Sequence, residues 1–427
     1  MTAKIIKRTD DRITIQLEIP IFDSMLQSES KIQDCLNEAG ILATQEVMKS
    51  YDTDGSPIIV GQSKYYKKER SFHTYQCVYG SFKIERYIYQ TAKGGRSYCP
   101  MDERARIVNR STPRFAKLLS SKYAELGAQR VAEDIEESFN RKVSKLFVQN
   151  IAESVGTFLN LKEENWNYVL PEFEESIKTI SVGLDGTMIN MVDDGYREAM
   201  VGTISFYNRC GERMHSIYVG SSPEKGKESF LKKFERELNK AKILFPKAHC
   251  IGIADGAKCN WTFLDKHTHS QVLDFYHASE YVTDASDILM SKSKQEDREN
   301  WLEDQCHKLK HNHTGPNAFL NLLKKESAKN SSKNSVEELK SIIVYFQNNI
   351  RSKRMNYAEH IAQNHPIGSG VEAAAKTVVK ARLCQSGMKW KSEGADIVLT
   401  LRALKLSSGR WDQSWNKIDR YGYINAA

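Results

Sequence analysis

The sequence predicts an α/β protein, in which helices cover both faces of a mixed sheet and an α+β region comes first. Apolar runs of strand length, such as 179–185 and 249–255, flank the segment 226–243. That segment places its apolar residues on one helical face, as an amphipathic helix does: Phe230, Phe234, Leu238 and Ala241. At about 150 residues per domain, the 427 residues predict two to three domains.

Composition restricts the class of protein further. Hydrophobic residues make up 40% of the chain and charged residues 27%, so a sizeable core can form. Mean hydropathy is −0.55, and no apolar run approaches the roughly 18 residues that cross a bilayer, so we exclude a membrane protein. No apolar stretch follows the first basic residues, and we therefore expect no secretory signal and a cytoplasmic location.

The cysteines and histidines leave a metal site open. Eight cysteines are scattered without a CxxC pair, which is typical of reduced cytosolic thiols. One cluster is a possible zinc site, namely Cys306, His307, His311 and His313. Structural zinc sites usually have paired ligands at both ends, so a basic helix end running into a loop is the favoured interpretation. The net charge of 62 − 54 = +8 favours a polyanionic partner without proving one.

The region 1–110 has the pattern of an α+β unit. Residues 11–19 alternate as a strand does, a helix is expected over 25–48, and 72–90 is expected to form a hairpin. This hairpin is basic and rich in aromatic residues. Contact with DNA and burial of one face explain that composition equally well.

Residues 111–170 are expected to form a helical DNA-binding domain. Three short helices are predicted over 113–125, 127–138 and 143–154, in the manner of a helix-turn-helix whose recognition helix Ser144 caps. The candidate DNA contacts are basic: Arg141, Lys142 and Lys145. An ordinary three-helix bundle has the same pattern.

The order of elements after residue 170 is typical of an RNase H-like domain. Three strands are followed by a helix, a strand, a helix and a fifth strand over 271–276. We assign 171–278 and 365–405 to this catalytic domain. The helical residues 279–364, with a polar linker at 325–337, are expected to be an insertion domain, and 406–427 a C-terminal tail.

Three carboxylates are candidates for catalysis. Asp185 and Asp255 each end a predicted strand, where ligand sites of α/β sheets gather, and Glu372 follows a glycine-rich turn. Oxygen ligands suit Mg²⁺ or Mn²⁺, and two such ions can support phosphoryl transfer. Alternatively, the aspartates are turn residues and Glu372 only complements a helix dipole.

The chain resembles a Kra-type bacterial insertion-sequence transposase, a branch of the DDE transposases related to the Mutator superfamily. The resemblance extends from about residue 55 and is carried by these segments: VGLDGTM (182–188), GYREAMVGTISFY (195–207), GIADGAKCNW (252–261), LDFYHASEY (273–281), PIGSGVEAAAKTVVKARL (366–383), GMKWKSEGADIVLTLRAL (387–404) and WDQSWNKIDRYG (411–422). It implies that Asp185, Asp255 and Glu372 are the catalytic, metal-binding triad. It also matches Asp274 and His277 to an aspartate-x-x-histidine motif, in which His277 contacts DNA or, alternatively, caps the fifth strand.

The residues after Glu372 are strongly basic. Eight Lys or Arg lie between 376 and 410, against two acids, which suits contacts with phosphates. The candidate DNA-binding residues there are Lys376, Lys380, Arg382 and Lys389, with Trp390 as a base-stacking residue. A solvated helix face, and burial of the tryptophan, are the alternatives.

The resemblance therefore implies a metal-dependent enzyme that binds terminal inverted repeats, cleaves DNA strands and transfers them to target DNA. Two Mg²⁺ or Mn²⁺ ions, double-stranded DNA and a homodimer or larger assembly are the expected cofactors and partners, in the bacterial cytoplasm at the nucleoid. Two other functions remain open: a domesticated DNA-binding protein without catalysis, and a structure-selective nuclease of the same fold.

Overall fold

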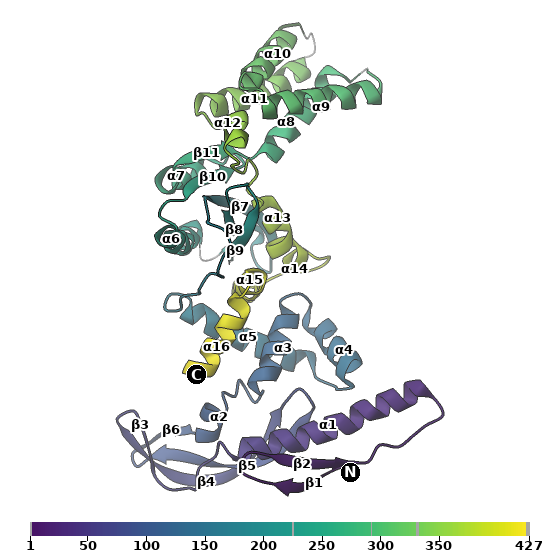
Figure 1. Ribbon diagram of the computed structural model, residues 1–427, viewed down its shortest axis with the longest axis vertical. Coiled ribbons are helices and arrows are strands. Elements are labelled where there is room, and N and C mark those ends of the chain that lie inside the picture. The colour runs from purple at the N-terminus through teal and green to yellow at the C-terminus, as the bar shows by residue number, and fades with distance from the viewer. Residues whose placement is uncertain (1, 224–225, 292, 330–332, 424–427) are drawn as a thin grey trace. The chain divides into compact units, whose positions relative to one another are not determined.

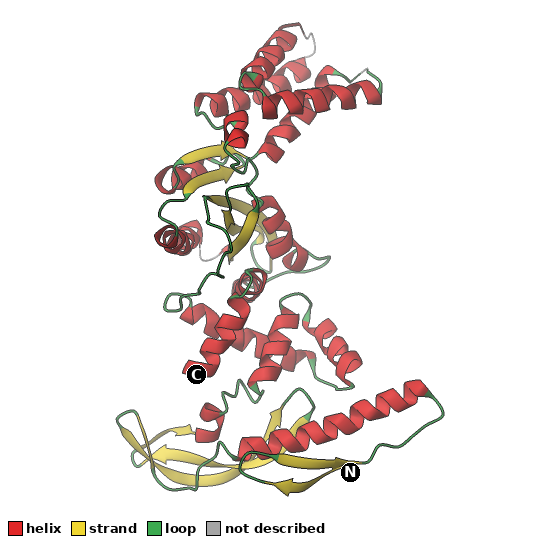
Figure 2. Ribbon diagram, in the orientation of Figure 1, coloured by secondary structure: helices red, strands yellow, loops and turns green. Residues whose placement is uncertain are grey.

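The computed structural model describes residues 2–223, 226–291, 293–329 and 333–423. It is a mixed α/β protein with 51% helix and 22% strand, arranged in three sheets (Figure 2). The chain forms two compact units. The first unit contains Met1–Val169, Thr400–Lys405 and Gly409–Ala427, and the second contains Leu170–Leu399 and Leu406–Ser408.

The N-terminal part of the first unit contains two sheets and a long helix (Figure 1). Strands β1 (Ala3–Arg8) and β2 (Ile13–Leu17) pair antiparallel, and helix α1 (Met25–Lys49) begins at Ser24, whose hydroxyl accepts a hydrogen bond from the Gln27 N–H. The expected hairpin is the centre of a four-stranded antiparallel sheet, which runs β3 (Ile58–Val60), β4 (Ser63–Gln76), β5 (Ser81–Thr91) and β6 (Gly94–Tyr98).

The three predicted helices of the first unit are confirmed, after a short helix α2 (Pro100–Arg104). They are α3 (Pro113–Tyr123), α4 (Ala128–Phe139) and α5 (Lys145–Lys162). Asn140 ends α4 in the left-handed region, at φ 49°, and the Ser144 hydroxyl caps α5 by accepting from the Phe147 N–H at 3.2 Å. A helix, a tight turn and a capped helix therefore follow one another as predicted.

The C-terminal residues differ from the expected tail. Helix α16 (Arg410–Tyr421) belongs to the first unit, where Lys117 forms a 2.6 Å ion pair with Asp412 and Arg106 donates to the Asp419 carbonyl. Its partners lie about 300 residues earlier in the chain. A sequence pattern carries no sign of contacts at that separation.

The second unit is built on a five-stranded sheet in the order β11-β10-β7-β8-β9. Strands β7 (Thr179–Met191), β8 (Gly195–Tyr207) and β9 (Arg213–Ser221) are antiparallel, whereas β10 (His249–Ala254) and β11 (Ser270–Leu273) run parallel to β7. All five strands were predicted, but β7 extends past its predicted end at Asp185 to Met191. The fifth is shorter than expected, because the chain turns into a helix at Asp274.

Helices pack on both faces of this sheet. A side-chain carbon on Gly202 of β8 would lie 2.5 Å from the Phe234 ring of α6 (Gly226–Leu244), while the neighbouring Thr203 bonds the Ser369 carbonyl on the other face. The predicted apolar face of α6 is fully buried. The remaining helices around the sheet are α7 (Lys258–His267), α13 (Val371–Ala374), the π-helical turn η2 (Ala375–Lys380), α14 (Ala381–Leu383) and α15 (Ser392–Leu406).

Between β11 and α13 the described chain is helical, as predicted. The helices are α8 (Phe275–Leu289), α9 (Gln295–His311), α10 (Gly315–Lys329), α11 (Lys333–Arg351) and α12 (Tyr357–Ala362). The predicted polar linker at 325–337 is wrong where the structure describes it, because α10 extends to Lys329 and α11 begins at Lys333; residues 330–332 lie outside the described part. None of the described helices is long and apolar enough to cross a membrane.

Candidate active site

Asp185 and Asp255 lie at equivalent positions on neighbouring strands. In the parallel pair β7–β10, Gly183 is opposite Ile253, and each aspartate follows two residues later. One oxygen of each carboxylate is held locally: Asp185 Oδ1 accepts from the Gly186 N–H at 2.7 Å, and Asp255 Oδ1 accepts from the Ala257 N–H at 3.2 Å. The parallel register therefore brings the two carboxylates to neighbouring positions, as the sequence predicted. The expected strand end at Asp185 is wrong, because β7 continues to Met191, whereas Asp255 does follow the end of β10.

The charge balance at Asp185 indicates an anionic cluster. Burial, and then the charge of Asp255, raise the pKa of Asp185 to about 6, against the lowering effects of the Gly186 N–H, His277 and Lys380. Such mutual repulsion between carboxylates is relieved by a proton or by a cation. His277 and Lys380 lie near enough for their charges to act on Asp185.

Glu372 follows a turn that packs on β7, the strand that contains Asp185. The preceding turn places Gly370 at φ +65°, a conformation that favours glycine, and α13 begins after it. A side-chain carbon on Gly183 of β7 would lie 2.8 Å from Ser369 Cβ and 3.0 Å from Val371 Cβ, so this turn rests directly on the strand that leads to Asp185. The Glu372 carboxylate forms a 2.7 Å ion pair with Lys376, one turn along the helix.

Asp274 holds this turn in place. Its side chain is buried, and Oδ2 accepts hydrogen bonds from Ser369 N at 3.0 Å and from Ser369 Oγ at 2.8 Å. Its other oxygen accepts from the Tyr276 N–H and caps α8. Asp274 thus joins the start of α8 to the turn before Glu372.

His277 lies in the first turn of α8 and does not cap the fifth strand. Its Nδ1 is 3.0 Å from a Glu280 oxygen, and its side chain is partly exposed. The Tyr276 ring next to it is half exposed, and the Lys376 ammonium group lies 5.9 Å from its centre. His277, Tyr276 and Lys376 therefore form a partly exposed rim next to Glu372.

The predicted basic residues after Glu372 divide into two groups. Lys376, Lys380 and Lys389 are exposed. The prediction for Arg382 is corrected: the side chain is 2% exposed, and its guanidinium lies 5.0 Å from the Trp390 ring centre. Trp390 is half-buried and donates its indole N–H to the Leu383 carbonyl, so this pair stabilises the fold and is not free to contact DNA.

A second correction concerns Arg141 in the first unit. It is 5% exposed, its guanidinium lies 3.9 Å from the Phe115 ring centre, and it donates to Gln76 Oε1 at 2.6 Å. Burial lowers the pKa of Arg141 to about 10. The burial of Arg141 leaves the exposed Lys142 and Lys145 as the predicted DNA contacts of this region.

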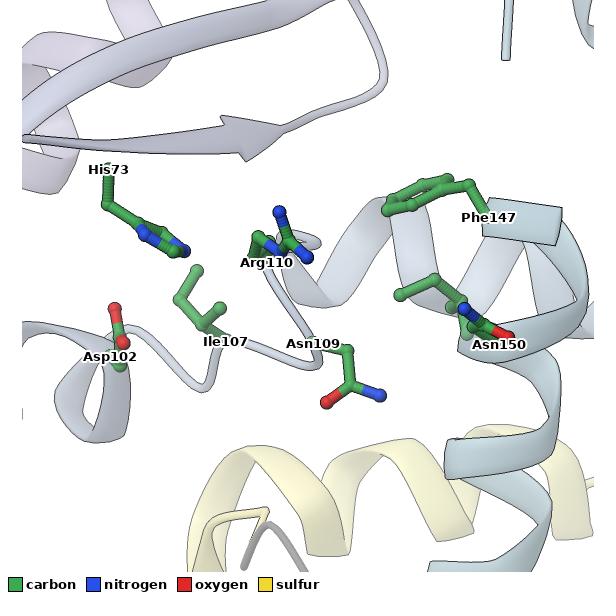
Figure 3. A pocket seen from close by; sticks show the side chains of 8 residues that line it. His73, Asp102, Ile107, Asn109, Arg110, Phe147 and Asn150 are labelled. Atoms are coloured by element: carbon green, nitrogen blue, oxygen red, sulfur yellow. The ribbon is translucent and has the colours of Figure 1, made fainter. Parts of the chain in front are cut away.

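The predicted recognition helix α5 also lines a pocket of the first unit. The Phe147 ring points toward the segment that carries Arg110, which has a left-handed φ of 70°, and Asn150 also lines the pocket (Figure 3). His73 and Asp102 line the far side of the pocket. One side of α5 therefore faces its own unit near the start of the helix.

Two residues without a predicted role hold the backbone next to the two aspartates. Asn260, buried on α7, donates to the Leu184 carbonyl at 3.2 Å, and the Tyr345 hydroxyl of α11 donates to the Asp255 carbonyl at 3.0 Å. The Tyr345 ring also lies 3.2 Å from where Gly256 would carry a side chain. Tyr345 comes 90 residues after Asp255, so no local pattern indicates this contact.

The donor set suits a hard divalent cation. Asp185 and Asp255 offer oxygen ligands whose repulsion a cation would relieve. The Glu372 carboxylate is paired with Lys376 and is not among the charges that act on Asp185. Within the described residues, no three His, Cys, Asp or Glu side chains are arranged to hold a metal ion. This finding covers Asp185, Asp255 and Glu372 as well as the residues around His307 and His311. No protein-family model matches the chain, and no curated protein matches it.

Proposed function

We propose that the chain is a DDE-type DNA transposase with an RNase H-like catalytic domain. One observation carries the proposal: Asp185 and Asp255 lie at equivalent positions along the adjacent parallel strands β7 and β10, in a sheet with three antiparallel strands followed by two parallel ones. Asp185 lies within β7, and Asp255 directly follows β10. This is the strand order expected from the sequence for an RNase H-like domain. The turn that leads to Glu372 rests on the same central strand, which supports a shared site.

In this site Asp185, Asp255 and Glu372 are the residues that would hold Mg²⁺ or Mn²⁺. When bound, two such ions would activate the attacking oxygen and stabilise the leaving oxygen of phosphoryl transfer. Lys380 places positive charge near Asp185, where an anionic phosphodiester would need it. His277, at the rim, is a candidate contact for the scissile phosphate.

The reaction has two steps. Water attacks a phosphodiester at the transposon end, the bond to the 3′ oxygen breaks, and a 3′-hydroxyl and a 5′-phosphate result. The 3′-hydroxyl then attacks a phosphodiester of the target and displaces a second 3′-hydroxyl. The proposal includes the helical residues 279–364 as an insertion domain, double-stranded DNA as partner, a homodimer or larger synaptic assembly, and the bacterial nucleoid as location.

Cleavage of DNA that carries the element's own ends tests the proposal. The wild-type protein with Mg²⁺ or Mn²⁺ is expected to nick these ends and to join them to a second DNA. Asp255→Ala is expected to abolish both products while binding of the ends persists. Full cleavage by Asp255→Ala would remove the basis of the proposal. Nicking of branched DNA in preference to the ends would favour a nuclease.

A further inference from the structure

The positive charge of the protein is concentrated in the four-stranded sheet of the first unit. Residues 63–96 contain eight Lys or Arg and two Glu, a net charge of 8 − 2 = +6, compared with +8 for the whole chain. Residues 113–156, which hold the predicted recognition helix, contain seven Lys or Arg and six Asp or Glu, a net charge of 7 − 6 = +1. The sheet therefore attracts a polyanion more strongly than the helices do.

The basic side chains gather at one end of this sheet. Tyr65 of β4 pairs with Thr91 of β5, so the β3–β4 and β5–β6 turns lie at the same end. Five basic side chains there are exposed: Lys64, Lys67, Lys68, Lys93 and Arg96. Among the described residues none of these five has an acidic partner within ion-pair distance. Gly61 and Gly94, in the turns, have open space where a side chain would be.

Aromatic rings hold several of the cations on the strand surface. The Lys64 ammonium lies 5.5 Å from the Tyr66 ring centre, and Lys67 lies 5.4 Å from that of Tyr87. The Arg70 guanidinium also lies over the Tyr87 ring, 4.8 Å from its centre. A base that stacks on the same face of these rings would have to displace the cations. The surface is therefore suited to phosphates, which a duplex presents on its outside.

We infer that the basic end of the β3–β6 sheet, defined as Lys64, Lys67, Lys68, Lys93 and Arg96, binds the backbone of double-stranded DNA. The inference rests on the proposed function and moves its main electrostatic contact from the helices 113–156 to this sheet. At this end β3 and β6 flank β4 and β5, so the five basic residues belong to the end of a four-stranded sheet and its turns. The helices are then left for reading sequence, with Lys142 and Lys145 as minor phosphate contacts.

Binding of the full-length protein to a fluorescent duplex of mixed sequence, measured over a series of salt concentrations, tests the inference. The sheet variant is K64Q/K67Q/K68Q. A matched control, K324Q/K325Q/K340Q, removes three exposed lysines from α10 and α11 of the second unit. A third variant, K142Q/K145Q, tests the helices. Each lost phosphate contact is expected to reduce the log–log salt slope by about 0.9, so the sheet variant should lose about 2 to 3 units of slope and at least tenfold in affinity.

The control is expected to bind like the wild type, and K142Q/K145Q is expected to lose less slope than the sheet variant. A sheet variant with the wild-type slope overturns the inference, and if K142Q/K145Q then loses affinity the proposed function survives with its helical contact. If the wild-type protein binds no duplex, both the inference about the sheet and the proposed function are overturned. Tighter binding of a single-stranded oligonucleotide overturns the duplex assignment. Thermal melts verify folding, and the three single variants replace the triple variant if it is unfolded.

Discussion

Asp274 accepts two hydrogen bonds from Ser369, one from its backbone N–H and one from its hydroxyl, across 95 residues of sequence. The same carboxylate caps the helix that carries His277. Since Ser369 lies in the turn before Glu372, one buried carboxylate fixes two segments of the candidate site relative to each other. Asp274 is therefore a positioning residue, which acts through Glu372 and His277.

Replacing Asp274 with Asn tests this role. Asp274 accepts through both oxygens, whereas Asn has one acceptor oxygen, so either Ser369 or the Tyr276 N–H loses its acceptor, and we expect a loss of about 2 to 4 kcal/mol in the free energy of unfolding. Under conditions where the variant is folded, cleavage should need more Mg²⁺ for half its maximal rate. Urea unfolding and a metal titration measure the two effects. A folded variant with the wild-type Mg²⁺ dependence would show that Asp274 does not position Glu372.

The second prediction concerns the repulsion at Asp185. Its pKa is raised from 3.8 to about 6, so a proton on Asp185 stabilises the fold at low pH, and this contribution is lost as pH rises through 6. Asp185→Asn removes the repulsion. Without metal and above pH 7, we expect this variant to be more stable than the wild type by about 1 to 3 kcal/mol.

Thermal melts with and without Mg²⁺ measure the effect of Asp185→Asn. The wild type should gain stability from the ion, and the variant should gain less. The matched replacement Asp284→Asn, on the exposed side of α8, serves as the control for removing one negative charge. Equal gains from Mg²⁺ in the wild type and in Asp185→Asn would place the ion elsewhere.

A group of histidines before the Glu372 turn predicts acid sensitivity. The His365 ring stacks on His249, with centres 4.9 Å apart, and its Nδ1 lies 3.4 Å from that of His360. Burial, and then the charges of His249 and His360, lower the pKa of His365 from 6.5 to about 4. The unfolded chain therefore binds a proton more readily, and stability is lost as pH falls from about 6.5 to about 4.

Replacement of His365 by Gln should make stability less dependent on pH in that range. Chemical denaturation at several pH values from about 4 to 7 measures the slope. His311→Gln, at an exposed position on α9, should leave the slope unchanged. A variant of His365 with the same slope as the wild type would show that other groups cause the acid sensitivity.

Local patterns predicted the parts of this fold that depend on neighbouring residues. The apolar face of α6 follows from a period of 3.6, and the strands that lead to Asp185 and Asp255 follow from single apolar runs. The sequence also predicted that Asp185 and Asp255 lie together, which the parallel register of β7 and β10 supports, but it ended β7 at Asp185 because the Asp-Gly pair looks like a turn. The sequence predicts Asp274 within the fifth strand, because LDFY is as apolar as a strand. The structure has Asp274 as the N-cap of α8, and its bonds to Ser369 join residues too distant in sequence for a local pattern to indicate them.

Among the predicted DNA contacts, the errors concern buried arginines. Arg141 and Arg382 were expected on the surface because arginine usually lies there, but each packs on an aromatic ring from a different segment, Phe115 and Trp390. The π-helical turn at Ala375–Lys380 was also unexpected. The residues of this turn, AKTVVK, give no sign of it, since they fit a regular helix with only the usual penalty for threonine and valine.

The burial of Arg141 predicts a loss of stability when the residue is shortened. Arg141→Ala removes the contact with Phe115 and leaves Gln76 Oε1 without its donor, so we expect a loss of about 2 to 4 kcal/mol. Arg141→Met keeps most of the volume and should lose less. Urea unfolding measures stability, and duplex binding of the folded protein should not change. A folded Arg141→Ala variant with wild-type stability and weaker DNA binding would restore the original assignment.

The last prediction concerns the contact between the central strand and the turn before Glu372. Gly183 is buried, and a side-chain carbon there would lie 2.8 Å from Ser369 Cβ and from Thr203 Oγ1, much closer than atoms pack. Gly183→Ala should therefore push the turn away from β7, reduce stability by about 1 to 3 kcal/mol and reduce cleavage by more than the lost folded fraction explains. Gly127→Ala, where the structure has open space and φ is −68°, is the control. Gly127 is the N-cap of α4, so we expect a loss of at most about 1 kcal/mol and an unchanged cleavage rate per folded molecule. Cleavage rates per folded molecule, measured beside urea unfolding, separate displacement of Glu372 from simple destabilisation. If Gly183→Ala loses stability but keeps the wild-type rate per folded molecule, the distance between Glu372 and β7 does not determine the rate of cleavage.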